Sequence, residues 1–185
     1  MGWYSDFKRD VEMCRERDPG PGTGPIGAFL RNQGLWASLQ YRTAHAVYKS
    51  DLPPAIKRPV VLALGVWQKA VEVTTDITLP KSAEIGAGLF LPHSGRVVVD
   101  SAAHLGEGCT LCQGSTIGKR TQHGVFGVPT IGNHVYLAPN AVVVGPIRVG
   151  DDASIGPNTV VFKDVPAGAL VRPVLPEIIE RPASK

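Results

Sequence analysis

Two groups of residues in this chain have types and spacings suited to metal or redox chemistry. Cys109 and Cys112 form a Cys-x-x-Cys motif, which occurs in zinc sites and in thiol–disulfide centres. Three histidines, at His104, His123 and His134, carry imidazoles of the kind that bind metals. The six-residue repeat described below places Cys109 at an inward position and Cys112 at a corner. We therefore expect buried thiols there and no metal.

Other polar residues gather at two interruptions of that repeat. His93 and Arg96 belong to the segment Pro92-His93-Ser94-Gly95-Arg96, which accompanies a two-residue insertion. Arg120 and His123 belong to a longer interruption, residues 119–130. Loops on a rigid scaffold often carry function, so both interruptions are candidate site segments.

The scaffold is visible as a periodic pattern. Aliphatic residues recur at six-residue steps, with one shift at each interruption, at thirteen positions: Leu79, Ile85, Leu91, Val99, Leu105, Leu111, Ile117, Ile131, Leu137, Val143, Val149, Ile155 and Val161. Glycine follows six of them, and the fifth residue of each six is mostly small or β-branched. An α-helix cannot keep a period of six on one face, whereas short strands that bend at every sixth residue can.

The predicted fold is mainly β: a left-handed parallel β-helix of hexapeptide repeats with just over four coils, following a small N-terminal α-helical cap. A sandwich of short strands is the alternative, and thirteen matches in register argue against it. We expect the cap over residues 1–76, the β-helix over 77–170 with a loop protruding at 119–130, and a C-terminal tail over 171–185.

The cap carries helical signals. Helices are expected over residues 3–17, 34–50 and 54–73, the first ending at Asp18-Pro19-Gly20-Pro21. In the second helix, the expected buried face consists of Leu35, Leu39, Ala46 and Val47.

Composition narrows the class of protein. In 185 residues, 43% are hydrophobic and 19% charged, a globular composition, and the net charge of +3 comes without the basic runs of a nucleic-acid binder. The longest apolar run, residues 60–67, is too short to cross a membrane. Residues 1–17 do not resemble a signal peptide, and three cysteines give no disulfide framework. We expect a cytoplasmic protein that binds neither nucleic acid nor membrane.

These residues resemble the serine acetyltransferase family of hexapeptide-repeat acyltransferases. The resemblance covers nearly the whole chain. It is carried by Glu16-Arg17-Asp18-Pro19 and Tyr41-Arg42-Thr43-Ala44-His45, by residues 85–93 and Val97-Val98-Val99, by Ser115-Thr116-Ile117-Gly118, and by residues 155–161 and Asp164-Val165-Pro166. The two cap motifs together with the position of His93 are its specific part.

The resemblance implies direct transfer of an acetyl group from acetyl-CoA to the hydroxyl of serine, with His93 as general base. It also implies that Asp18 binds the amino group of the acceptor. Acetyl-CoA, as co-substrate, would meet Thr116, Ile117, Gly118, Ala138, Pro139, Gly156 and Pro157, with Lys163 and Arg172 near its phosphates. A homotrimer is expected, alone or as a dimer of trimers, with no metal.

The sequence also departs from the family pattern. The carboxylate that precedes the catalytic histidine is Pro92 here, and the aspartate that orients this histidine falls at Thr78, with Asp76 two residues away. An Arg-His pair that grips the serine carboxylate falls at residues 127–128, Gly-Val. Arg96, Arg120 and His123 are therefore further candidates for binding the acceptor. Glu177 replaces a cation expected near the nucleotide, and the C-terminal Lys185 gives no reason to expect a complex with cysteine synthase.

Three alternatives remain open at this point. The acceptor can be a sugar or another pathway alcohol in place of serine. The chain can also be a scaffold that kept the fold and lost catalysis. A more distant alternative is a zinc carbonic anhydrase of the same fold, although the His-x4-His pair expected there is missing.

Overall fold

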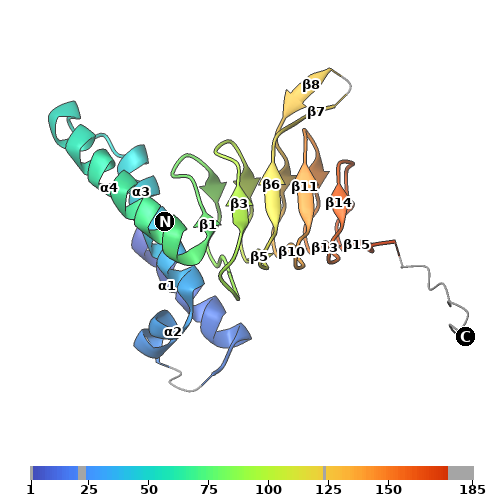
Figure 1. The fold of residues 1–185 in the computed structure, drawn as a ribbon, viewed down its shortest axis with the longest axis horizontal. Coiled ribbons are helices and arrows are strands. Elements are labelled where there is room, and N and C mark those ends of the chain that lie inside the picture. The colour runs from blue at the N-terminus through green and yellow to red at the C-terminus, as the bar shows by residue number, and fades with distance from the viewer. Residues whose placement is uncertain (1, 21–23, 123, 175–185) are drawn as a thin grey trace, which may run out of the picture.

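The computed structural model describes residues 2–20, 24–122 and 124–174. Its N-terminal part is a group of helices, and its C-terminal part is a stack of short strands from which one hairpin projects (Figure 1). The helices are α1 (Trp3–Arg17), α2 (Pro25–Arg31), α3 (Gln33–Lys49) and α4 (Pro54–Thr75). The helical part extends through Thr75, and the first strand begins at Ile77.

Three of these helices follow the sequence prediction closely, while α2 was not predicted. The predicted face of α3 was right for Leu35, which is buried, and wrong for Leu39, Ala46 and Val47, which are only partly buried. The buried face also includes Ala37, Ser38, Tyr41, Arg42 and Ala44. The polar side chains among them are buried because each has a partner: Ser38 and Arg42 donate to Asp10 of α1, and Tyr41 and Arg42 donate to backbone carbonyls of the first coil.

The strands stack into three parallel sheets. The first sheet has the order β1 (Ile77–Thr78), β3 (Val97–Val99), β6 (Thr116–Gly118), β11 (Val142–Val144) and β14 (Val160–Val161). The second contains β2 (Glu84–Ile85), β4 (His104–Leu105), β9 (Thr130–Ile131) and β12 (Arg148–Val149). The third contains β5 (Thr110–Leu111), β10 (Tyr136–Leu137), β13 (Ser154–Ile155) and β15 (Leu170–Val171).

The interior of this stack confirms the repeat. All thirteen aliphatic positions are buried, none more than 8% exposed. The small residues at the fifth positions are buried as well, among them Ala83, Ala103, Ala141 and Ala153, each with 0% exposure. A six-residue step therefore returns each aliphatic side chain to the same core.

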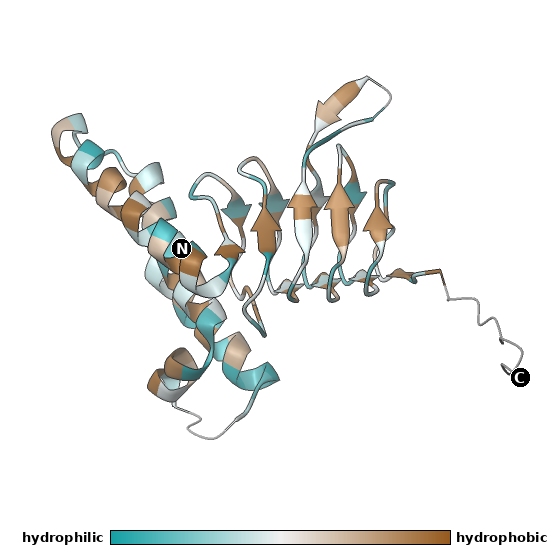
Figure 2. Cartoon of the chain, in the orientation of Figure 1, coloured by the Kyte–Doolittle hydropathy of each residue, from teal (hydrophilic) through white to brown (hydrophobic). Residues whose placement is uncertain are grey.

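The outward faces of the three sheets differ chemically. Along the first sheet, the outward residues in register are Thr78, Val98, Thr116, Val142 and Val160, all β-branched. Along the second they are Glu84, His104, Thr130 and Arg148, and along the third Thr110, Tyr136, Ser154 and Leu170. Figure 2 shows how apolar residues dominate the strands of the first sheet.

The described residues of 119–129 lie outside the three stacked sheets, whereas Thr130, which was predicted to lie in the protruding loop, belongs to β9 of the second sheet. The protruding segment forms a hairpin of β7 (Arg120–Gln122) and β8 (Val125–Gly127) that projects from the stack (Figure 1). On the helical part, α4 presents exposed apolar residues, with Leu62 72% and Val66 67% exposed. None of the described helices combines the length and apolarity needed to cross a membrane.

Candidate active site

His93 lies in the two-residue insertion, at the corner where the chain passes from the third sheet to the first. Before it, Phe90 bridges to Thr110, with Phe90 N donating to Cys109 O at 2.9 Å. After it, Gly95 N donates to Thr75 O at 2.9 Å, and Gly95 O accepts from Gly114 N at 2.8 Å. Gly95 has φ +115°, a conformation that side chains disfavour. The insertion is thus held to the scaffold on both sides of the exposed His93.

A pocket of about 270 Å³ contains the side chain of His93. Its lining comes from the end of α1, from the insertion and from the third sheet with its following corner: Arg17, Phe90, Pro92, His93, Thr110, Cys112, Gln113, Tyr136 and Pro139. The pocket has the size of a small-molecule subsite. No Asp or Glu is among these lining residues.

Two pairs of polar side chains in the pocket are hydrogen-bonded to each other, and one buried polar atom lacks a partner. The guanidinium of Arg17 donates to Thr110 Oγ1. The Cys112 thiol donates to the hydroxyl of Tyr136, with 3.4 Å between sulfur and oxygen. This hydrogen-bonded neighbour, followed by burial, raises the pKa of Tyr136, so the phenol stays protonated near neutral pH. Gln113 Oε1 is buried and has no hydrogen-bond partner within the described structure.

A buried ion pair fixes α1, and therefore Arg17, against the coil of His93. Asp10 accepts from Arg42 Nε at 2.9 Å and from Arg42 Nη2 at 3.0 Å. It also accepts from the backbone N of Leu89 at 2.8 Å and from Ser38 Oγ. Arg42 in turn donates to Ile85 O at 2.6 Å and to Gly86 O at 2.7 Å.

Close packing of α3 adds to this support. A Cβ at Gly34 would overlap both Cβ and the carbonyl oxygen of Leu91, two residues before His93. Only glycine allows the helix to approach the strand backbone this closely. Together with the ion pair, this contact sets the position of the corner relative to the cap.

Other residues predicted to bind the acceptor lie elsewhere. Asp18 forms an ion pair with Arg31, 3.6 Å between Oδ2 and Nε, and does not line the His93 pocket. Arg96 is exposed and also lies outside its lining. Arg120, on the hairpin, stacks over the ring of Phe162, 4.6 Å from its centroid. His123 lies outside the described residues.

The backbone does not place Asp76 on the same strand face as Thr78, where the family's aspartate would lie. Asp76 ends α4 in a left-handed conformation with φ +56°, and strand β1 begins only after it. The residue therefore does not share a strand face with Thr78. The two residues would share a face only if the strand extended back to Asp76, but α4 occupies the chain up to Thr75.

The pocket residues that were not predicted from the sequence include Arg17, Gln113 and Tyr136. A signal for two of them exists. The repeat places Tyr136 beside Thr110 on the outward face of the third sheet, and Gln113 follows at the corner next to the insertion. Arg17 could not be placed, because its position depends on how α1 packs.

Two of the predicted cofactor residues, Pro139 and Pro157, follow the same corner as His93. The corner backbones are joined coil to coil: Gly114 N to Gly95 O, Asn140 N to Gln113 O and Asn158 N to Pro139 O, at 2.8 to 3.0 Å. These stacked corner residues form a continuous track along the β-helix. Three coil steps of about 4.8 Å make the track about 14 Å long. Pro139 lines the His93 pocket, and Pro157 lies exposed one coil further.

Some of these residues offer only backbone to a ligand. Ile117 is 1% exposed and belongs to the core, and its carbonyl oxygen accepts from Asp100 N at 2.8 Å. Ala138 and Gly156 are buried, and their N–H groups donate to Ile155 O and Val171 O. Thr116 and Gly118, on the first sheet, are partly exposed.

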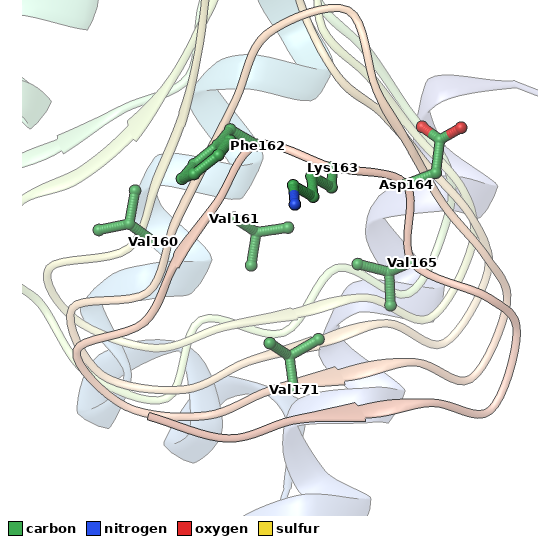
Figure 3. Close-up of a pocket in the computed structure, with 7 residues that line it drawn as sticks. All are labelled: Val160, Val161, Phe162, Lys163, Asp164, Val165 and Val171. Atoms are coloured by element: carbon green, nitrogen blue, oxygen red, sulfur yellow. The ribbon is translucent and has the colours of Figure 1, made fainter. Parts of the chain in front are cut away.

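Lys163 lines a different pocket, of about 330 Å³, at the C-terminal end of the stack. In Figure 3 the coils trace a triangular outline, and Val161, Val165 and Val171 point into it, while Asp164 points away. This pocket shares no lining residue with the His93 pocket. Lys163 is therefore at the opposite end of the stack from the helical part.

The residues first considered for metal binding are dispersed. His104 is on the outward face of the second sheet, and His134 occupies a turn with φ +55°. Burial raises the pKa of the Cys109 thiol to about 11. Within the described ranges, no three His, Cys, Asp or Glu side chains come together as metal ligands would.

Comparison with known proteins places this geometry in a family. Residues 129–163 match the family described as bacterial transferase hexapeptide (six repeats). The serine acetyltransferase of Helicobacter pylori is 34% identical over 164 residues, 89% of this chain and 91% of the relative. That of Mycobacterium tuberculosis is 31% identical over 173 residues, 94% and 72% of the two chains. The chain belongs to the serine acetyltransferase family.

Solved structures agree with this assignment. The Neisseria gonorrhoeae serine acetyltransferase in complex with serine has a TM-score of 0.74 at 25% identity, covering 91% of this chain and 65% of that one. The Brucella abortus enzyme in complex with coenzyme A has a TM-score of 0.79 at 24% identity, covering 99% and 70%. This chain therefore spans about two thirds of the solved chains. The family likeness implies that the β-helix is left-handed, and that the protein is an acyltransferase.

Proposed function

We propose that this family member transfers the acetyl group of acetyl-CoA directly to the hydroxyl of a small acceptor, with serine as the first choice. The observation that carries the proposal is the arrangement along one corner. A pocket of small-molecule size holds His93, and a track of corner residues leads away from it through Pro139 and Pro157. A small acceptor and an elongated thioester could thus meet at His93.

In the proposed reaction, His93 acts as general base. The acceptor oxygen attacks the thioester carbonyl carbon, forming a C–O bond as the C–S bond breaks. The imidazole takes the hydroxyl proton and returns it to the departing thiolate, so the products are an acetyl ester and free CoA thiol. Because an alcohol is a weak nucleophile near neutral pH, a positioned base contributes about 10²- to 10⁴-fold in rate.

The corner track fits a pantetheine chain better than it fits a bulky group. Its residues include Gly114, Pro139 and Pro157, and the two prolines offer no N–H donor. Lys163 and Arg172, both exposed near the C-terminal end of the stack, are the proposed partners for phosphates. The coenzyme A complex of the Brucella relative supports acetyl-CoA as the co-substrate.

We propose a homotrimer built on the first sheet. Its outward row of β-branched residues includes Val98, 43% exposed, and Val160, 57% exposed. Burying such a flat apolar row against another copy of the chain is favourable in free energy, because it removes apolar surface from water. The second sheet, with Glu84 and Arg148 outward, is suited to solvent. The exposed apolar residues of α4 would allow the caps of two trimers to pair.

The decisive experiment follows release of free CoA thiol from acetyl-CoA, with serine, then sugars, then other small alcohols. His93→Ala is expected to lower turnover by about 10²- to 10⁴-fold. His104→Ala, at an exposed histidine outside the pocket, serves as the matched control and should leave turnover unchanged.

Each outcome has a definite meaning. Turnover with another alcohol but not with serine would keep the transferase and replace the acceptor. Absence of turnover with every acceptor, together with absence of acetyl-CoA binding in a calorimetric titration, would refute the proposed function and leave a non-catalytic scaffold.

A further inference from the structure

The corner of Pro139, where the proposed acetyl-CoA track leaves the His93 pocket, has no free backbone donor. Pro139 has no N–H. The three other N–H groups of this corner already donate to backbone carbonyl oxygens at 2.9 to 3.0 Å: those of Ala138, Asn140 and Ala141. A thioester carbonyl that lies against this corner would therefore find its hydrogen-bond donor on a side chain.

Tyr136 brings a side-chain donor to this part of the pocket. Of the lining residues, Tyr136 and Pro139 belong to the coil furthest from the helical part. Tyr136 faces outward from β10, beside Thr110 of β5 in the register of the third sheet. Thr110 is 2% exposed, whereas Tyr136 is 40% exposed. The outward face of this sheet is therefore covered at Thr110 and open to a ligand at Tyr136.

The phenol of Tyr136 is oriented by Cys112. The Cys112 thiol donates to the Tyr136 hydroxyl oxygen, with 3.4 Å between sulfur and oxygen. A hydroxyl group has one proton to donate and lone pairs that accept, so this contact leaves the proton of Tyr136 available. Among the described residues, none accepts a hydrogen bond from that hydroxyl. The hydrogen bond with Cys112, followed by burial, raises the pKa of Tyr136, so the phenol keeps its proton near neutral pH.

We propose that Tyr136 is a catalytic residue whose hydroxyl donates a hydrogen bond to the thioester carbonyl oxygen of acetyl-CoA. As the acceptor oxygen bonds to the carbonyl carbon, negative charge develops on the carbonyl oxygen, and the hydroxyl stabilises that charge without transferring its proton. The carbonyl re-forms as the C–S bond breaks, and the departing thiolate takes the proton held by His93. This inference rests on the proposed transferase function and adds a second group that acts on the reacting atoms.

The test uses Tyr136→Phe, which removes the hydroxyl and keeps the ring, and follows release of CoA thiol with the acceptor that the wild type turns over best. Loss of one oxyanion donor lowers kcat by about 10²- to 10³-fold, and we expect a fall of this size. The Kd for acetyl-CoA, from calorimetric titration, should change little, because the donor acts mainly on charge that develops in the transition state. Tyr48→Phe is the matched control: it removes a phenol hydroxyl of similar exposure, 43%, outside the pocket, and should leave kcat unchanged.

Two variants of Cys112 test how Tyr136 is oriented. Cys112→Ala keeps the phenol but removes its donor, so kcat should fall by a smaller factor than in Tyr136→Phe. Cys112→Ser should recover activity, because a hydroxyl also donates to the phenol oxygen. In the Tyr136→Phe background, Cys112→Ala should cause no further loss of kcat, because the thiol acts through the phenol.

Three results would contradict the Tyr136 proposal. A kcat of Tyr136→Phe within about tenfold of the wild type, with the fold intact by circular dichroism, would overturn it and leave the transferase standing. Weaker binding of acetyl-CoA with an unchanged kcat would make Tyr136 a binding contact only. A wild type that turns over no acceptor would refute the transferase and the Tyr136 proposal together, and this failure is seen before any variant is compared.

Discussion

The buried pair of Asp10 and Arg42 should dominate the attachment of the cap to the β-helix. Asp10 has 0% exposure and its carboxylate accepts four hydrogen bonds, from two guanidinium nitrogens, Ser38 Oγ and Leu89 N. Asp10→Ala removes all four acceptor contacts and leaves a buried guanidinium without a counter-charge. Loss of one partner of a buried ion pair costs about 3–5 kcal/mol.

That cost is a large part of the free energy of unfolding of an ordinary domain, about 5–15 kcal/mol. We expect urea unfolding, followed by circular dichroism, to show Asp10→Ala destabilised by this amount. Asp6→Ala, one turn earlier on α1 and partly exposed, should change the free energy by less than about 0.5 kcal/mol.

A double-mutant cycle isolates the pair itself. Arg42→Ala removes two further bonds, to Ile85 O and Gly86 O, so its own cost should also be several kcal/mol. The double variant should lose less than the sum of the two single variants, with a coupling of about 1–3 kcal/mol. A cost below about 1 kcal/mol for Asp10→Ala, or a coupling near zero, would refute the view that this pair fastens the cap.

Two further predictions concern buried titratable groups. Burial raises the pKa of Tyr41 to about 12. The unfolded chain therefore releases this proton first, so the stabilisation is complete below about pH 10 and is lost as the pH rises towards 12. Tyr41→Phe should cost about 1–3 kcal/mol at pH 7, because Ala83 O loses its donor and Ile85 N its acceptor, and should flatten the fall in stability above pH 10 in alkaline unfolding curves. Cys109, with a pKa of about 11, should resist iodoacetamide at pH 8 in the folded protein and react in urea, as measured by mass spectrometry; rapid labelling of the folded protein would contradict its burial.

The repeat was predictable because it is a local pattern with a strict period. Each of the residues Leu79 to Val161 that sets the period faces the core, and each needs only its own six-residue step to be placed there. The same regularity predicted a protruding loop over residues 119–130 because the repeat is interrupted there, but it did not predict that the loop is a hairpin or that Thr130 belongs to β9. Helix α2 was missed because it is short, seven residues, and follows a Pro- and Gly-rich stretch typical of turns.

The candidate site was only partly predictable, because it joins segments through contacts that no local pattern encodes. Asp10 stands in a helix dense in charge, where a carboxylate is normally solvated, yet it is the most buried side chain of that helix. Once Asp10 and Arg42 pair, α1 must cross the coil of Leu89, and Arg17 then reaches the third sheet. His93 could be chosen as a candidate from the sequence because it lies at an insertion. The position of Arg17 depends on this packing, so it could not be predicted.

These contacts also explain why the site should lie at the cap end of an otherwise uniform stack. Coils that follow one repeat present the same backbone at every corner, so they cannot by themselves distinguish one position along the track from another. Among the described residues that line the His93 pocket, Arg17 is the one that comes from the helical part, so the cap meets the stack at the first coils.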